Sequence, residues 1–133
     1  MSLDNFYYPK SIAIIGASNN PNKAGYQIAN NMVRLGFDGK VYFVNPNEDI
    51  IFGQKSYNSI MDIEEPVDLI EIIIPAKGVL KVFEEAEKRG DIKAAIIMAS
   101  GFKETGIPEN IELEDQVLAI AKRAGIRVFG PNC

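Results

Sequence analysis

The segment from Gly16 to Gly25 has the residue types and spacing that best suit ligand binding. A short apolar run, Ser11–Ile15, ends at Gly16, and an amphipathic stretch with apolar residues at helical spacing begins at Ala24. A buried strand, a polar turn and a helix in this order begin a nucleotide-binding βαβ unit. In that unit backbone N–H groups and the positive end of the helix dipole face a phosphate. The sequence therefore predicts an anion-binding turn at this point.

The spacing of the glycines distinguishes between nucleotide classes. The dinucleotide fingerprint is G-x-G-x-x-G, whereas the next glycine after Gly16 is Gly25. An acidic residue that binds ribose hydroxyls should end the second strand, but Asn45 and Pro46 stand there. The two glycines also do not frame the P-loop pattern G-x-x-x-x-G-K-[ST]. The βαβ context is strong, and the match to NAD binding is poor.

Composition excludes several kinds of function. The net charge of −4 argues against a nucleic-acid partner, which calls for a basic surface. Histidine is absent from the sequence, which removes imidazole catalysis and histidine metal ligation, and we predict neither a metal site nor a catalytic residue. Cys133 is the only cysteine, and the apolar runs are too short to span a membrane. We expect a cytoplasmic protein with no membrane partner.

Strands and helices alternate along the chain. The predicted strands are Ser11–Ile15, Lys40–Val44, Leu69–Ile74, Ala94–Met98 and Arg127–Phe129. Residues 45–65 are expected to be an irregular connection with a short helical turn near residues 59–63. Continuous apolar strands predict an α/β fold: a Rossmann-like, doubly wound, five-stranded parallel sheet with helices on both faces and strand order 3-2-1-4-5.

Small and polar residues gather at the carboxyl ends of the predicted strands, where ligands of such sheets bind. Each of these ends taken alone is better explained as a structural turn. The acidic residues of the second long helix, Glu84, Glu85 and Glu87, are interpreted as an exposed helix face without a role. Cys133 is interpreted as an inert thiol, because no base is available to it. The five strand ends together predict a binding edge.

Taken together, these strand ends resemble the CoA-binding domain of NDP-forming acyl-CoA synthetases, relatives of the succinyl-CoA synthetase α subunit. The motifs are Ile-Gly-Ala-Ser at 15–18, Val-Asn-Pro at 44–46, Ile-Pro-Ala at 74–76, Ser-Gly-Phe at 100–102 and Gly-Pro-Asn-Cys at 130–133. They occur in the family's order and span the chain from about Phe6 to Cys133. The closing Gly-Pro-Asn-Cys is the most specific of them.

The resemblance implies coenzyme A, or an acyl-CoA, as the ligand. It implies that Gly16, Ser18, Asn19, Lys23 and Gly25 hold the phosphates, that Asn45 and Pro46 border the nucleotide, and that Pro75, Ala76 and Lys77 form a wall of the site. It also implies that Ala99, Ser100 and Gly101 line the pantetheine arm and that Asn132 and Cys133 lie near the reactive thiol. A valine at Gly25 is expected to block CoA and leave the core intact.

Two departures from the family pattern matter. Many relatives carry a lysine just after the Asn-Pro step, whereas Asn47, Glu48 and Asp49 stand here, so weaker CoA binding is expected. Residues 1–133 correspond to a single CoA-binding domain, interpreted as the N-terminal fragment of a larger synthetase. Its expected partners are the phosphohistidine and ATP-grasp modules of that enzyme, and the isolated domain is expected to be inactive. The alternatives are a stand-alone CoA-binding regulatory protein, the CoA-binding domain of an acetyltransferase, and an NAD(P)-dependent dehydrogenase fragment.

Overall fold

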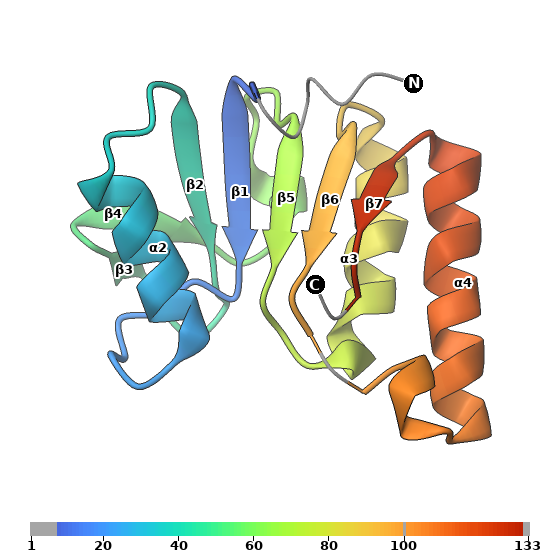
Figure 1. The fold of residues 1–133 in the computed structure, drawn as a ribbon. Helices are drawn as coiled ribbons and strands as arrows, with labels where there is room; N and C mark the ends of the chain where they lie inside the picture. Colours follow the sequence, from blue (N-terminus) through green and yellow to red (C-terminus); the bar gives the residue numbers. More distant parts are fainter. Residues whose placement is uncertain (1–7, 100, 132–133) are drawn as a thin grey trace.

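A seven-stranded sheet runs through the computed structural model, which describes residues 8–99 and 101–131 (Figure 1). The strands are β1 (Ser11–Ile15), β2 (Lys40–Val44), β3 (Ile50–Ile51), β4 (Gln54–Tyr57), β5 (Leu69–Ile72), β6 (Ala94–Ile97) and β7 (Arg127–Phe129). The helices are α2 (Ala24–Arg34), α3 (Ala76–Arg89) and α4 (Pro108–Ala124), with 3-10 turns η1 (Ile60–Asp62) and η2 (Lys103–Thr105). The predicted helical turn near residues 59–63 is confirmed by η1.

The order of the strands corrects the prediction from sequence. The spatial order is β3-β4-β2-β1-β5-β6-β7, and every pair is parallel except β3 with β4. The predicted third strand, β5, pairs directly with β1, so the expectation that it lies beside β2 is wrong. β4 lies beside β2 instead, in the segment expected to be irregular. With β4 counted as the third parallel strand, the order becomes the 3-2-1-4-5-6 of a doubly wound sheet.

A two-residue turn, Phe52–Gly53, joins β3 to β4 and has positive φ angles of 50° and 74°. Such turns normally use asparagine or aspartate before glycine, because those residues tolerate the left-handed conformation. Here Phe52 adopts it, and its ring packs against Tyr26 of α2 and Phe43 of β2, with ring centroids 5.2 and 6.1 Å apart. Ring packing offsets the backbone strain, so tertiary contacts stabilise this hairpin.

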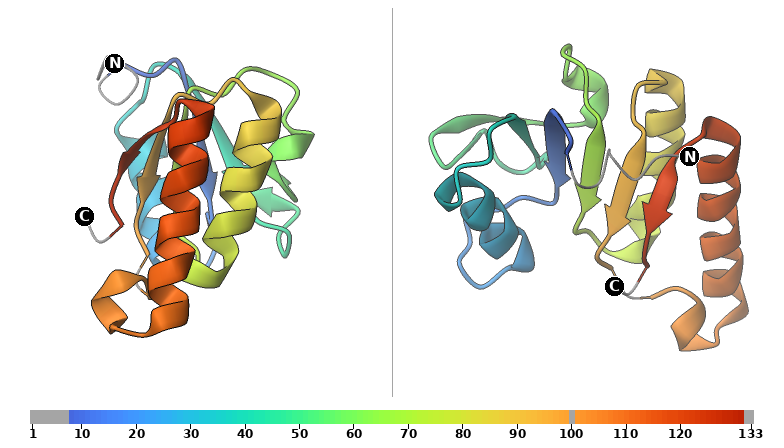
Figure 2. Two further views of the ribbon diagram at one scale, coloured as in Figure 1. Left: turned by 90° about the vertical axis from the view of Figure 1, so that its right-hand side faces the viewer. Right: turned by 45° about the horizontal axis from the view of Figure 1, so that its top comes forward.

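Helices cover both faces of the sheet, as predicted, and the apolar core forms two layers (Figures 1 and 2). α2 lies on one face, where Ala29 belongs to the same buried cluster as Ile14. α3 and α4 lie side by side on the opposite face, where Phe83 and Val117 are buried with Ile15. Alternate residues of β1 therefore enter different layers, which explains why this strand is apolar along its whole length.

The guanidinium of Arg89 attaches η1 to the end of α3. It donates hydrogen bonds to three backbone carbonyl oxygens around η1, those of Ile60 (2.6 Å), Ile63 (2.6 Å) and Glu65 (2.9 Å). Its Nη2 also lies 2.8 Å from Oδ2 of Asp91, and only 9% of the Arg89 side chain is exposed. Because η1 borders the carboxyl edge of the sheet, this network fixes one boundary of the site described next.

Candidate functional site

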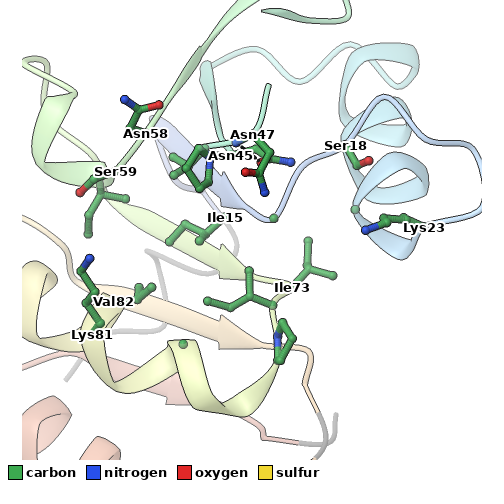
Figure 3. Close-up of a pocket in the computed structure, with 18 of the residues that line it drawn as sticks. Ile15, Ser18, Lys23, Asn45, Asn47, Asn58, Ser59, Ile73, Lys81 and Val82 are labelled. Carbon is green, nitrogen blue, oxygen red and sulfur yellow. Dashed lines mark hydrogen bonds between the residues drawn. The ribbon is translucent and has the colours of Figure 1, made fainter. Parts of the chain in front are cut away.

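A cleft of about 610 Å³ opens at the carboxyl ends of β1, β2 and β5 (Figure 3). The chain leaves β1 for α2 on one face of the sheet and leaves β5 for α3 on the other, so the cleft lies at the topological switch point. The turn after β1, the loop after β2, the segment between β4 and η1, and the first turns of α3 form its walls. Ligands of doubly wound sheets bind at this place.

Many of the residues predicted to bind a ligand line this cleft. They are Gly16, Ser18, Lys23, Gly25, Asn45, Pro46 and Pro75. They come from three segments far apart in the sequence, and the pairing of β1 with β2 and β5 brings these segments to one edge. The structure therefore gathers these side chains in one place, and the contact of each with a ligand stays a prediction.

Gly16 and Gly25 allow the start of α2 to lie against the end of β1. Gly16 has a φ of +99°, and its N–H donates to the carbonyl oxygen of Val44 (2.9 Å). A Cβ at Gly25 would overlap the carbonyl oxygen of Gly16, and a Cβ at Gly16 would overlap that of Ile73. The expectation that a valine at Gly25 leaves the core intact is therefore wrong. The close approach is between two backbone segments of the protein itself.

The N-terminus of α2 borders the cleft without a side-chain cap. Lys23 is the N-cap residue and makes no capping hydrogen bond, and the first turn of the helix contains no acidic residue. Ser18 is buried, and its Oγ accepts the N–H of Asn20 (3.0 Å), which shapes the turn before the helix. Uncapped N–H groups, the helix dipole and the Lys23 ammonium all favour an anion at this end of the cleft.

Asn45 joins the end of β2 to the turn after β1. Its Nδ2 donates to the carbonyl oxygen of Ala17 (2.9 Å), and its Oδ1 accepts the N–H of Asn47 (2.8 Å). Dinucleotide-binding folds place at this position a carboxylate that binds the ribose hydroxyls. A neutral amide whose two ends are both engaged within the protein is a poor substitute, so the geometry agrees with the poor match to NAD binding.

Asn19 lies outside the cleft, although it is predicted among the phosphate-binding residues. Its Nδ2 donates to Glu48 (3.0 Å) and to the carbonyl oxygen of Ile50 (2.7 Å), and its Oδ1 accepts the N–H of Phe52 (3.4 Å). The side chain therefore connects the turn after β1 to the β3–β4 hairpin. These contacts hold the turn after β1 in place from outside the cleft.

One face of α3 completes the cleft, and the sequence-based interpretation misses it. Lys81 and Glu85 line the cleft from this helix, and Oε2 of Glu85 accepts the hydroxyl of Ser59 (2.8 Å). The expectation that Glu85 lies on an exposed face without a role is therefore wrong. Helical spacing is the signal that could have found this face, because Gly78, Lys81 and Glu85 follow one another at intervals of three and four residues.

Loop residues of the cleft carry no periodic signal, so the sequence does not single them out. They are Asn47, Asn58 and Ser59. Asn47 follows Pro46, and the other two lie between β4 and η1, a segment that enters the site only because β4 pairs with β2. Recognition of β4 as a strand would have placed Asn58 at the carboxyl edge of the sheet.

The remaining predicted residues lie beside the cleft or outside the described residues. Ala76 and Lys77 begin α3 and do not line the cleft. Ala99 and Gly101, in the segment that follows β6, do not line it either. A Cβ at Gly101 would lie 3.2 Å from that of Ala76, so the end of β6 adjoins the start of α3. Three predicted positions, Ser100, Asn132 and Cys133, fall outside the described residues.

No group of three or more histidine, cysteine, aspartate or glutamate side chains among the described residues could hold a metal ion. None of the helices in residues 8–99 and 101–131 is long and apolar enough to cross a membrane.

Comparisons with known proteins agree on one family. A family model described as a CoA binding domain matches residues 10–133. The ADP-forming acetate–CoA ligase of Methanocaldococcus jannaschii is 49% identical over 126 residues, which is 95% of this chain and 17% of the ligase. The structure of the dinucleotide-forming acetyl-coenzyme A synthetase 1 of Ca. Korarchaeum cryptofilum, in complex with phosphate and ADP, is 41% identical with a TM-score of 0.91. The match covers 98% of the present chain and 27% of the synthetase chain.

A smaller solved structure is also similar. A conserved hypothetical protein from Pyrococcus furiosus is 32% identical with a TM-score of 0.71, and the match covers 90% of both chains. The present chain therefore spans about a sixth of the M. jannaschii ligase and nearly all of the small P. furiosus protein.

Proposed function

Because the chain belongs to the family of CoA-binding domains, we propose that it supplies the CoA site of an ADP-forming acyl-CoA synthetase. In that reaction a carboxylate, CoA and ATP yield an acyl-CoA, ADP and phosphate. The observation that carries the proposal is the cleft at the switch point, bordered by an uncapped helix N-terminus and by Lys23. High identity to an ADP-forming acetate–CoA ligase over nearly the whole chain supports the same enzyme class.

In the proposed complex, the pyrophosphate of CoA lies at the N-terminus of α2. The N–H groups of Ala24 and Gly25 and the ammonium of Lys23 face it there. The Ser18 hydroxyl donates to a phosphate oxygen while its Oγ continues to accept the Asn20 N–H. The pantetheine arm then extends along the ends of β6 and β7, where small residues permit close approach to the backbone.

The role of this domain in the reaction is to bind CoA and orient its thiol. The 133 residues contain no histidine, so this chain offers no imidazole to carry a phosphoryl group. We assign phosphoryl transfer to partner modules of the synthetase, a phosphohistidine domain and an ATP-grasp module. The acyl phosphate formed there is attacked by the thiolate sulfur of CoA, which forms the thioester and releases phosphate.

Calorimetric titration with CoA, acetyl-CoA, NAD and ATP in parallel tests the proposal. We expect CoA to bind with a Kd of roughly 10 μM to 1 mM, because no lysine follows Pro46. NAD is expected to give no signal, because Asn45 replaces the acidic residue. Substitution Ser18→Ala should weaken CoA binding about tenfold through loss of one charge-assisted hydrogen bond. Binding of NAD without any response to CoA would contradict the proposal.

A second candidate is a stand-alone CoA-binding regulatory protein, which the match to the small P. furiosus protein over 90% of both chains favours. The same cleft would hold CoA in either case. The two candidates differ in their partners. Co-purification of the natural protein with modules that bind ATP would support the synthetase, and its isolation as a CoA-binding protein without them would support the regulator.

A further inference from the structure

We propose that Lys81 recognises the 3′-phosphate of CoA and so determines the specificity for CoA over dephospho-CoA. This inference rests on the proposed function and extends it to one end of the ligand. It names a residue that the interpretation from sequence missed, on the face of α3 that completes the cleft.

The positions of the cationic side chains carry the proposal. Within the described part of the chain, Lys23 and Lys81 are the two basic residues that line the cleft. Figure 3 shows them at opposite ends of it, Lys23 near Ser18 and Lys81 near Ser59. CoA likewise carries two separate centres of negative charge, the pyrophosphate and the 3′-phosphate of the ribose. One cation at each end of the cleft matches this distribution of charge.

The N-terminus of α2 decides which cation meets which phosphate. Backbone N–H groups and a helix dipole reinforce Lys23, and a pyrophosphate bridges adjacent N–H groups of this kind. The adenosine end of the ligand then extends over the apolar side chains of Ile15 and Ile73 toward Ser59 and Lys81 (Figure 3). Lys81 is therefore the cation that remains for the 3′-phosphate.

The other charged groups near this end make Lys81 necessary there. Glu85 is the acidic residue among the lining side chains in the described ranges, and the hydroxyl of Ser59 holds its carboxylate (2.8 Å). The loop after β2 offers no compensating cation, and Glu48 in it is engaged by Asn19 (3.0 Å). Without Lys81, the carboxylate of Glu85 would oppose a phosphate at this end of the cleft.

Lys81 is also available to a ligand. Among the ion pairs in the described residues, none includes Lys81, although Glu85 lies four positions further along the same helix. The hydroxyl of Ser59 occupies an oxygen of that carboxylate instead. The Lys81 side chain is exposed at the cleft, so binding a phosphate does not require it to leave another partner.

Titration of CoA and dephospho-CoA against four proteins tests the inference: the unaltered chain, Lys81→Gln, Lys81→Arg and Lys88→Gln. Lys88 is a matched control, because it is an exposed lysine of the same helix that does not line the cleft. We expect the unaltered chain and the Lys88→Gln variant to prefer CoA by roughly three- to tenfold. Lys81→Gln should lose the preference for CoA or bind dephospho-CoA more tightly, because Glu85 then faces the 3′-phosphate without a cation. Lys81→Arg should retain the preference.

The outcomes separate the two proposals. If the unaltered chain binds neither ligand, the proposed function fails, and this inference fails with it. If it binds CoA but Lys81→Gln retains the preference, or weakens CoA and dephospho-CoA by the same factor, only the assignment of Lys81 is overturned. Thermal melts of each variant verify that it is folded, and the preference should shrink as the salt concentration rises.

Discussion

Individual residues of the turn after β1 serve the fold as well as the cleft. Gly25 lies so close to Gly16 that a Cβ would overlap its carbonyl oxygen. We expect Gly25→Ala to lower the free energy of unfolding by about 2–4 kcal/mol, because the backbone segments must separate. Gly78→Ala is the control: its Cβ would lie 2.9 Å from Cδ1 of Ile74, a flexible side chain, in a helix that favours alanine. Equal urea midpoints for the two variants would contradict this account.

Glu71 is a buried acid in β5, with 8% of its surface exposed, and burial raises the pKa of its carboxyl. The folded state then binds a proton more tightly than the unfolded state does. The stability gained in this way is present below the unfolded pKa and is lost as the pH rises through the folded one. We expect Glu71→Gln to be more stable than the unaltered chain at neutral pH, with a difference that shrinks toward about pH 4. If burial does not raise this pKa, thermal melts of the two proteins would differ by the same amount at every pH in this range.

Among the secondary-structure elements, η1 is attached to the end of α3 by the side chain of Arg89. Arg89 satisfies three carbonyl oxygens around η1 and pairs with Asp91. We expect Arg89→Met to lower the free energy of unfolding by about 2–4 kcal/mol, because two partly buried carbonyl groups and a carboxylate lose their partner. CoA affinity should fall as well, because Ser59 immediately precedes η1. Arg123→Met is the control, since its pair with Glu87 (2.6 Å) is exposed, and denaturant unfolding should change little.

The stability that the Arg89 network gives to η1 should also depend on pH, because Asp91 belongs to this network. Partial burial acts to raise the pKa of Asp91, but hydrogen bonds from Arg89 and from the N–H of Val67 hold it below its usual range. This carboxylate therefore contributes stability above its unfolded pKa, and that stability is lost as the pH falls through the lower folded value. Arg89→Met should flatten the acid side of the stability profile. An unchanged acid limb, measured by melts at falling pH, would remove Arg89 as the cause.

At the scale of the whole molecule, binding and turnover should separate. The walls of the cleft that α2 and α3 form lie within the described residues, so the proposed CoA site has these walls in this chain. The sequence contains no histidine that could carry a phosphoryl group. We expect the purified chain, supplied with ATP, acetate and CoA, to form no acetyl-CoA above a blank. CoA at a hundred times its Kd should nonetheless raise the free energy of unfolding by about 2.7 kcal/mol. Release of ADP that depends on CoA would contradict the assignment of phosphoryl transfer to partner modules.

Local features of the sequence determined the α/β class, the parallel core strands and the helix ends. Apolar runs such as Ser11–Ile15 mark buried strands wherever they pair, because both faces must be covered. Gly90 ends α3 in the left-handed conformation, a preference that belongs to the residue itself. The sequence also identified the turn between Gly16 and Gly25 and the end of β2, since residues that follow parallel strands meet at one edge.

Only the tertiary structure decided the position of β4 and the far end of the cleft. Phe52 tolerates its turn conformation because its ring packs against Tyr26 and Phe43, a contact between three separate elements. Lys81 and Glu85 are surface residues by their helical pattern, and they face the cleft because α3 leaves β5 on the opposite side of the sheet from α2. Periodicity reports which side of a helix is apolar. The order of the strands and the direction of each crossover determine what the polar side meets.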